Sequence, residues 1–343
     1  FRTERGSAEG IALVLRAIEK EINKKRAAVA TRKRLLGAKA RTANNDGVYV
    51  AVTDVAKAYD TVAFERALYN SQYRGKPLKL LRAWLYERET RVTINSKISN
   101  AFNVERGTPQ GAVGSPPTFA DFVDSVTKVC ALYGVEVVTN RPKIATPLFA
   151  DDIALICGNW GDLKRAWKAL LEWMDKNGLD FNVGKCSTMF IPTNKKAKHP
   201  SESLRIGRKA VKWAKEVTYL GIQIKAARFT TTNKGEANEE SIPQKVVNAW
   251  VPIQLMLSEG QIPLKSAITL YESAVLSKLF YGSEFRIHNR IPKSWIKFHK
   301  DCCRYMCGSY KTDHGCTVRG ELGLPSLQQM LDKRVTNLVI RNL

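Results

Sequence analysis

The stretch ATPLFADDIALIC, residues 145–157, sets two adjacent carboxylates between two short apolar runs. The runs Ala145–Ala150 and Ile153–Cys157 are each of strand length, and Asp151 and Asp152 lie where one run gives way to the next. This pattern predicts a tight hairpin of two buried half-strands with the acidic pair at its tip. Asp-Asp is also ordinary turn chemistry, so the pair taken alone leaves a plain structural turn open as the alternative.

A third carboxylate ends an apolar run further towards the N-terminus. Residues Val48–Val52 are almost continuously apolar, which is typical of a strand buried on both faces, and Asp54 follows them. Two neighbouring strands would bring Asp54 beside Asp151. Carboxylates gathered at the ends of buried strands repel one another and lose hydration unless a cation joins them. Oxygen ligands suit Mg²⁺ or Mn²⁺, and two such ions serve phosphoryl transfer.

Three segments, in this order, resemble motifs A, B and C of reverse transcriptases. They are DVAKAYDTV (Asp54–Val62), RGTPQGAVGSPPTF (Arg106–Phe119) and FADD (Phe149–Asp152). The Lys-Ala-aromatic-Asp core of the first is closer to the non-LTR retrotransposon (LINE-type) branch than to group II intron enzymes. Further similar segments extend the resemblance over almost the whole chain: Phe1-Arg2 with RGSAEGI (5–11) before motif A, GLDFNVGKCSTMFI (178–191) as motif D, TYLG (218–221) as motif E, then LFYGSEFRI (279–287) and ELGLPSL (321–327).

The resemblance gives catalytic roles to the residues that match these motifs. Asp54 and Asp151 are expected to hold the two metal ions, and Asp152 completes the acidic cluster. Lys185 matches the lysine of motif D, a candidate general acid for the leaving pyrophosphate. An exposed turn lysine without a catalytic role remains the alternative for Lys185.

The resemblance also implies a nucleotide site and a primer grip. Tyr59 matches the aromatic residue whose ring meets a ribose 2′-hydroxyl and so favours deoxynucleotides. Gln110 and Gly111 match the motif B turn near the templating pair, where glycine lets the backbone approach nucleic acid closely. Core packing for Tyr59 and an ordinary loop role for Gln110 are the alternatives. The expected primer-grip residues are Tyr219, Leu220 and Gly221.

The charge of the chain points to a polyanionic partner. Its 55 Lys and Arg against 32 Asp and Glu give a net charge of +23, which favours binding to nucleic acid. With 44% hydrophobic and 25% charged residues, the composition excludes a wholly disordered or fibrous chain. No apolar run is long enough to span a membrane, so no membrane partner is expected.

A basic stretch follows the first predicted helix, in which Ile11, Val14, Ile18 and Ile22 recur at helical spacing. We expect this stretch to contact RNA, with a solvated helix end as the alternative. Its proposed RNA-binding residues are Lys24, Lys25, Arg26, Arg32, Lys33 and Arg34.

The expected fold class is α+β: a right-hand polymerase palm with partial fingers, followed by an all-helical thumb and C-terminal extension. The predicted domains are residues 1–45 (partial fingers and basic helix), 46–225 (palm) and 226–343 (helical thumb and extension), with a boundary in the polar stretch 226–240. The fingers segment that precedes motif A in the family is expected to be missing from this sequence. Further elements are predicted as helices at Phe64–Tyr69, Leu78–Tyr86, Ser115–Tyr133 and Asp162–Asn177, a hairpin around Asn95-Ser96, and strands near Thr188–Ile191 and Val217–Ile224.

The function expected from the resemblance is RNA-directed DNA polymerase, acting by two-metal phosphoryl transfer on an RNA template with a DNA primer and deoxynucleoside triphosphates. The alternative is a repurposed reverse-transcriptase-like protein that serves as a structural or RNA-binding component of a larger ribonucleoprotein. Two departures from motif B are mild: Ala112 where serine is common, and Gly114 where a bulky apolar residue usually precedes Ser-Pro.

The cysteine pattern indicates a compartment rather than a site. Seven scattered cysteines favour reduced thiols and an intracellular compartment. We expect that compartment to be the nucleus or an organelle, and the sequence does not choose between the two. Those near the C-terminus lie close to His299 and His314. Their irregular spacing favours cysteine and histidine in a helical core over a zinc site.

Overall fold

The computed structural model describes residues 7–36, 46–135, 148–149, 152–194, 197–226, 242–286, 291–310 and 312–342. The chain divides into two compact units, residues 1–232 and residues 233–343. Asp151 lies outside the described residues. No helix in the described ranges combines the length and apolar character needed to cross a membrane.

The first unit mixes helices and strands, and the second is built from helices wherever it is described. The elements of the first unit are α1 (Ser7–Leu36), β1 (Gly47–Asp54), α2 (Ala58–Thr61), α3 (Phe64–Asn70), α4 (Lys76–Tyr86), β2 (Glu89–Thr90), β3 (Thr93–Ile94), β4 (Lys97–Ile98), β5 (Phe102–Asn103), α5 (Ser115–Ala131), β6 (Leu148–Phe149), β7 (Asp152–Cys157), α6 (Trp160–Lys176), β8 (Ser187–Pro192), β9 (Arg205–Ile206), β10 (Lys209–Ala210), β11 (Lys212–Ala214), β12 (Glu216–Tyr219) and β13 (Ile222–Lys225). Those of the second are α8 (Gln244–Ser258), α9 (Leu264–Leu270), the π-helical η2 (Tyr271–Leu276), α10 (Ser277–Leu279), α11 (Ser283–Arg286), α12 (Lys293–Cys307), α13 (Gly315–Glu321) and α14 (Leu327–Asn342). The α+β class is confirmed, whereas the palm and thumb assignments stay predictions.

A five-stranded sheet in the order β11-β8-β1-β7-β6 forms the centre of the first unit. Strand β1 runs antiparallel to both β7 and β8, and β11 runs parallel to β8. Every residue of β1 except Asp54 is buried, which confirms the predicted strand with two covered faces. Because a strand in this position is hydrogen-bonded along both edges, β1 is well constrained to hold a side chain at its end.

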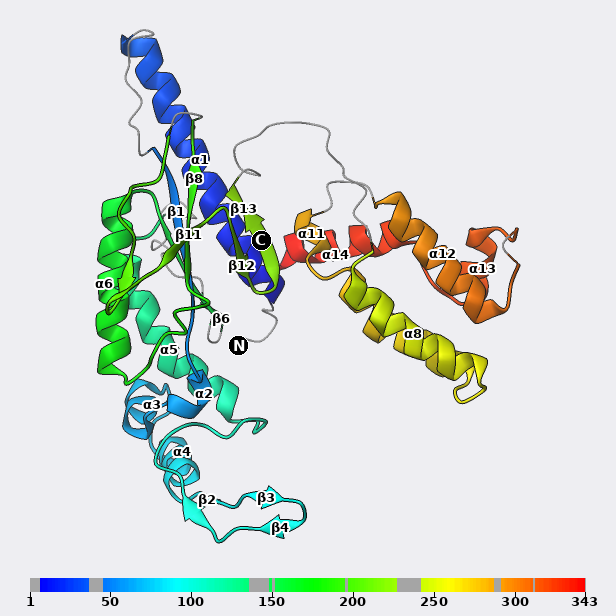
Figure 1. Ribbon diagram of the computed structural model, residues 1–343, viewed down its shortest axis with the longest axis horizontal. Helices are drawn as coiled ribbons and strands as arrows, with labels where there is room; N and C mark the ends of the chain where they lie inside the picture. The colour runs from blue at the N-terminus through cyan, green and yellow to red at the C-terminus, as the bar shows by residue number, and fades with distance from the viewer. Residues whose placement is uncertain are drawn as a thin grey trace. The chain divides into compact units, whose positions relative to one another are not determined.

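Helices cover the two faces of this sheet (Figure 1). Helix α1 packs on one face, where Ile11, Val14 and Ile18 are buried, and its C-terminal half extends past the end of the sheet (Figure 1). Helices α5 and α6 pack together, and α6 lies on the other face against β1 and β7. The helix predicted from the spacing of these isoleucine and valine residues is therefore confirmed.

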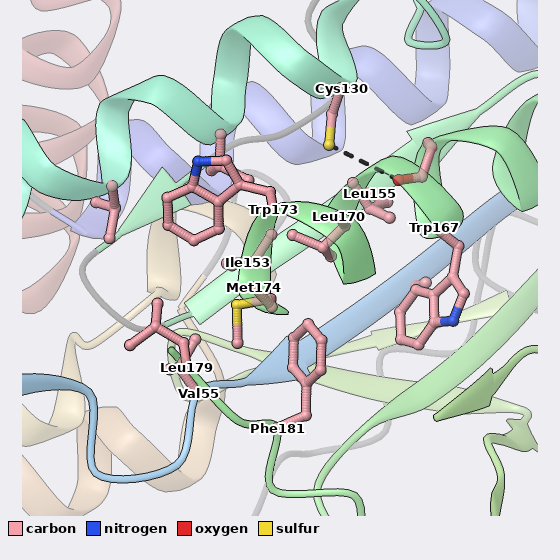
Figure 2. Packing of buried hydrophobic residues seen from close by; sticks show 14 of the residues in the cluster. Val55, Cys130, Ile153, Leu155, Trp167, Leu170, Trp173, Met174, Leu179 and Phe181 are labelled. Atoms are coloured by element: carbon pink, nitrogen blue, oxygen red, sulfur yellow. Dashed lines mark hydrogen bonds between the residues drawn. The ribbon is translucent and has the colours of Figure 1, made fainter. Parts of the chain in front are cut away.

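Figure 2 shows the core between α6 and the sheet at close range. Trp167, Leu170 and Trp173 of α6 belong to the same buried cluster as Ile153 and Leu155 of β7. Complete burial of a side chain of this size contributes roughly 1.5–3 kcal/mol relative to exposure. This packing determines which side chains of β7 face α6. Because side chains alternate along a strand, it also determines on which side of the sheet the first residues of β7 lie.

Helix α6 begins at Trp160, two residues before the predicted start. The side chain of Asn159 accepts a hydrogen bond from the backbone N–H of Asp162 at 2.8 Å. This bond caps the helix, because it satisfies a donor that has no partner within the helix.

The segment between α4 and α5 contains the predicted hairpin. Strands β3 and β4 pair through Thr93↔Ile98, and the turn residues Asn95 and Ser96 both have positive φ, at 47° and 65°. Positive φ at both turn positions is the conformation that best matches the twist of a two-residue hairpin. The second pair, β2 and β5, continues this hairpin towards the rest of the unit.

The second unit has a core of its own, which contains the buried His299, Cys302 and Cys303. The Tyr271 hydroxyl lies 2.8 Å from Nδ1 of His299, and burial, followed by the charge of Arg319, lowers the pKa of His299 to about 4. Burial also raises the pKa of Cys303 to about 12. The interpretation as helical core is confirmed for His299, Cys302 and Cys303, whereas it is wrong for His314 and Cys316, which are both exposed.

Candidate active site

The acidic residues meet at the end of the central strand. Asp54 is the last residue of β1, and the register places it directly opposite Asp152, the first residue of β7. Strand β6 pairs Phe149 with Asp152, so Ala150 and Asp151 connect the two strands in the sequence. The predicted proximity of Asp54 and Asp151 falls outside the described residues and stays a prediction.

Lys185 is the third predicted catalytic residue that the structure brings to this point. Its Nζ lies 3.2 Å from both carboxylate oxygens of Asp54. The segment that carries it runs beside the end of β1, because Asn182 N–H donates to the carbonyl of Asp54 at 2.9 Å. The Lys185 side chain is 65% exposed and that of Asp54 20%. Such an open ion pair contributes at most about 1 kcal/mol to stability, so Lys185 can leave Asp54 at little cost.

Directly after β1, the chain turns into α2 and presents Tyr59. Lys57, the residue before α2, has a left-handed backbone with φ 48°. The ring of Tyr59 stacks on Phe119 of α5 with a centroid separation of 4.7 Å and an interplanar angle of 25°. Tyr59 is half-buried, so one side of its ring packs against the core while the residue stays partly accessible. This placement is compatible with both of the roles considered for Tyr59.

The motif B segment is tied to α2 by its backbone. Thr108 N–H donates to the carbonyl of Tyr59 at 2.7 Å, and Gly107 N–H donates to that of Val62 at 2.8 Å. Gly107 has φ +87°, and a Cβ there would lie 2.7 Å from the carbonyl oxygen of Asp60. Only glycine allows this approach, since both the φ and the spacing exclude a side chain.

Two side-chain hydrogen bonds further hold the motif B segment in place, one to α2 and one from Arg88. Gln110 Nε2 donates to Oδ1 of Asp60 at 3.1 Å, and Arg88 Nη2 donates to the carbonyl of Gly107 at 3.2 Å. Burial lowers the pKa of Arg88. Gln110 and Gly111 are exposed, so the turn predicted to lie near a templating pair is open to solvent. Sequence reasoning missed Asp60, Arg88 and Gly107, although two of them stand inside the motifs.

The predicted primer-grip residues form a turn next to the acidic site. Tyr219 ends β12 and pairs with Ile222 of β13, and the turn residues Leu220 and Gly221 have φ 48° and 72°. Tyr219 is 1% exposed. Its pKa is raised first by burial and then by the negative charge of Asp152. The turn is thus electrostatically connected to the acidic site, although the sequence places Tyr219 far from Asp152.

The predicted RNA-binding residues on α1 have different surroundings. Lys24 is exposed and lies 3.8 Å from Glu21, whereas Lys25 is mostly buried and lies 3.3 Å from Asp46. Arg34 is exposed and Arg26 half-buried. The side chains of Arg32 and Lys33 lie outside the described part of the helix. Lys25 therefore has a structural partner, and the RNA-binding role of this stretch stays a prediction.

The donor set at the end of β1 suits a hard divalent cation. Asp54 and Asp152 are carboxylates on adjacent strands, and Asp151 precedes β7 directly. Carboxylate oxygens are the ligands that Mg²⁺ or Mn²⁺ prefers. Among the described residues, which exclude Asp151, no group of three or more His, Cys, Asp or Glu side chains is arranged to hold a metal. The fit to a metal therefore rests on the chemistry of the carboxylates and not on a complete ligand set.

Comparison with protein families identifies the chain. A model of the family described as "Reverse transcriptase (RNA-dependent DNA polymerase)" matches residues 11–224. The chain belongs to the reverse transcriptase family. The match runs from the buried half of α1 to β13, and so includes the acidic strand ends, the motif B segment and the turn at Leu220.

Two proteins that are similar to this chain come from mobile elements. The chain is 27% identical over 161 residues to the "Retrovirus-related Pol polyprotein from type-1 retrotransposable element R2" of Nasonia vitripennis, covering 44% of this chain and 15% of that protein. It is 24% identical over 238 residues to the "RNA-directed DNA polymerase from mobile element jockey" of Drosophila funebris, covering 67% of this chain and 25% of that protein. The chain thus spans about a quarter or less of these relatives, and the resemblance to the LINE-type branch is confirmed.

Solved telomerase structures show a weaker likeness. The telomerase of Candida albicans in complex with a fragment of telomeric RNA is 11% identical with a TM-score of 0.41, covering 88% of this chain and 49% of that one. Apo telomerase of Candida tropicalis is 12% identical with a TM-score of 0.41, covering 92% and 52%. Scores of this size add nothing to the family assignment.

Proposed function

We propose that this chain carries the polymerase site of an RNA-directed DNA polymerase, which extends a DNA primer on an RNA template with deoxynucleoside triphosphates. One observation supports this proposal most directly: Asp54 stands opposite Asp152 on adjacent strands, with Lys185 at 3.2 Å from Asp54. A purely structural descendant of the family has no need to keep these three charged groups together.

Asp54, Asp151 and Asp152 would hold Mg²⁺ or Mn²⁺. The ions would lower the pKa of the primer 3′-hydroxyl and balance the charge that develops on the leaving pyrophosphate. The ammonium of Lys185 is within reach of the same carboxylate, so it could pass a proton to the leaving group after a small movement of its exposed side chain. The Tyr59 ring, fixed on Phe119, would set the space available to the sugar.

A primer-extension assay tests the proposal on this chain with an RNA template, a DNA primer and Mg²⁺. Asp54→Asn should reduce extension by at least about 1000-fold, because it removes a carboxylate from the site. Asp180→Asn is the matched control, since it is the same change at an exposed residue whose backbone carbonyl accepts from Ala56 N–H at 2.8 Å. Equal extension by the two variants would refute the role of Asp54.

A binding measurement covers the case in which the chain extends no primer. Mn²⁺ bound to the protein is followed by electron paramagnetic resonance in the parent, Asp54→Asn and Asp180→Asn. The proposal expects binding in the parent and the control, and loss of affinity in Asp54→Asn. The same affinity in all three proteins would contradict a metal site at the end of β1.

The second candidate is a repurposed protein that acts as an RNA-binding component of a ribonucleoprotein. The net charge of +23 favours it, because such a surplus of Lys and Arg binds RNA without any chemistry at Asp54. Removing Lys185, which competes with a metal ion for the Asp54 carboxylate, distinguishes the two functions. Lys185→Met should strengthen Mn²⁺ binding if the site is a metal site, whereas a structural protein would show no Mn²⁺ binding in either form.

A further inference from the structure

A second basic surface lies far along the chain from the basic stretch of α1. Residues 195–215 contain eight Lys or Arg and a single acidic residue, Glu202, which makes a net charge of +7 out of the +23 of the chain. Six of these cations are described, and all six are exposed: Lys198, Arg205, Arg208, Lys209, Lys212 and Lys215. The reverse transcriptase chemistry proposed above assigns no role to them.

Arg208 and Lys209, the two adjacent cations of this segment, lie in a hairpin that is anchored to the core. Strands β9 and β10 pair through Ile206↔Lys209, so Gly207 and Arg208 form the turn between them. The residues that flank the hairpin, Leu204 and Val211, are buried at 4% and 1% exposure. In addition, the Trp167 indole N–H of α6 donates to the carbonyl of Arg205 at 2.8 Å. Arg208 and Lys209 therefore project from a fixed position, which reduces the entropy lost on binding.

Stacked aromatic rings lie within the same segment. The ring of His199 stacks on Trp213 at 4.6 Å with an interplanar angle of 20°, and Trp213 lies 5.3 Å from Trp160. His199 is exposed and Trp213 is half-buried. An aromatic stack with an accessible outer ring, in a segment rich in exposed Lys and Arg, is what proteins use to hold single-stranded nucleic acid.

Glu202, the single acidic residue of this segment, already has hydrogen-bond partners within the protein. Glu202 Oε2 accepts hydrogen bonds from the Trp160 indole at 3.1 Å and from the Lys164 ammonium at 3.0 Å. The Trp213 indole donates to the backbone carbonyl of Glu202 at 3.2 Å. The carboxylate thus helps to fix the aromatic rings, and Lys164 compensates the negative charge that would otherwise repel a phosphate.

Protection of a sheet edge explains only part of this charge. Strand β11 is an outer strand of the described sheet, and lysines on edge strands oppose pairing with other chains. That reason accounts for Lys212, which lies in β11. It does not account for Arg208 in a turn or for Lys198 in a loop beside the exposed ring of His199.

We propose that the surface formed by Lys198, His199, Arg205, Arg208, Lys209 and Trp213 binds single-stranded nucleic acid, with phosphates on the cations and a base on the outer face of His199. This surface packs against α6, on the opposite face of the sheet from α1, and is separate from the Asp54–Asp152 site. The inference goes beyond the polymerase function, because it requires no metal and no chemistry at Asp54.

Fluorescence anisotropy with the full chain and a labelled 20-nucleotide oligouridylate tests this proposal over a range of salt. Arg208→Gln/Lys209→Gln should weaken binding about tenfold at 0.15 M salt. It should also reduce the slope of log K against log salt by about 1.4, since each phosphate contact to a single strand contributes about 0.7. Lys128→Gln/Lys176→Gln is the control, because it removes two charges from exposed positions of the same unit. Equal effects of the two double variants would overturn the proposal.

His199→Ala separates stacking from charge. It should weaken binding of the single strand about fivefold or more and leave the salt slope unchanged. With a blunt RNA duplex of the same length, His199→Ala should have no effect, because paired bases cannot stack on the ring. Equal losses for single strand and duplex would contradict the assignment to single strands. Asp54→Asn should not change any of these affinities, so failure of the polymerase proposal and failure of this one give different results.

Discussion

Gly107→Ala tests whether the motif B segment is positioned by its close approach to α2. Gly107 has φ +87°, where a left-handed backbone costs an alanine about 1–2 kcal/mol. Its Cβ would also lie 2.7 Å from the carbonyl oxygen and 2.9 Å from Cα of Asp60, both backbone atoms that cannot rotate away. Overpacking of this kind costs about 1–3 kcal/mol more. We therefore expect a total destabilisation of roughly 2–5 kcal/mol.

Gly111→Ala is the matched control, because Gly111 has nearly the same φ, +86°, and a Cβ at this position would meet nothing within 4 Å. It should lose only the backbone part, about 1–2 kcal/mol. Urea unfolding of both variants gives the difference. Hydrogen exchange of the Gly107 and Thr108 amides, which donate to Val62 and Tyr59, reports whether the segment has detached instead. If both variants match in stability and in exchange, the close approach is not what holds this segment.

The remaining predictions concern three single residues. Burial lowers the pKa of His299 to about 4 in the folded protein, so the unfolded chain binds the proton at a higher pH than the folded one. The second unit should therefore lose about 3 kcal/mol of stability as pH falls from about 6.5 to about 4. Thermal unfolding of His299→Gln should lack this part of the pH dependence, and an unchanged dependence would exclude His299 as its source. Lys185→Met should slow single-turnover primer extension about 100-fold or more while changing the free energy of unfolding by less than about 1 kcal/mol, and an unaltered rate would leave Lys185 as an ordinary surface lysine. Tyr59→Ala should raise the ratio of ribonucleotide to deoxynucleotide incorporation about tenfold, which corresponds to about 1.4 kcal/mol of steric exclusion. Tyr59→Phe keeps the ring and should leave this ratio unchanged. If Tyr59→Ala has the same ratio as the parent protein, Tyr59 serves core packing alone.

Local periodicity was enough to predict the strands and helices that build the site. The apolar run ending at Asp54 and the run beginning at Ile153 are each buried along their length, so their hydrophobic pattern alone indicates a central strand. Helices α3 and α4 likewise lie where the sequence predicts them. Such elements are predictable because the spacing of apolar residues within a short segment already indicates which of its faces will be buried.

Contacts between distant segments could not be predicted in the same way. The fit of Gly107 against Asp60 depends on two backbones meeting, and nothing in the composition of either segment shows it. Strands β9, β10 and β11 were missed because they are two or three residues long and mostly exposed, which leaves no alternation to detect. The segment Val217–Ile224, expected to be a strand, is a hairpin because Leu220 adopts positive φ, a conformation that leucine rarely takes.

The central position of β1 has a consequence for synthesis of the protein on the ribosome. Its hydrogen-bonding partners come much later in the chain, since Tyr49 pairs with Cys157 on one edge and with Phe190 on the other. At about 5–20 residues per second, the first partner emerges roughly 5–20 seconds after β1. During that time an apolar strand with two open edges is exposed to aggregation. Helix α1 precedes β1 in the chain and packs on one face of the sheet that contains β1, so it can shield the strand as soon as the strand is made. Mutations that weaken the packing of α1 on β1 should therefore lower the yield of soluble nascent protein before they affect the folded protein.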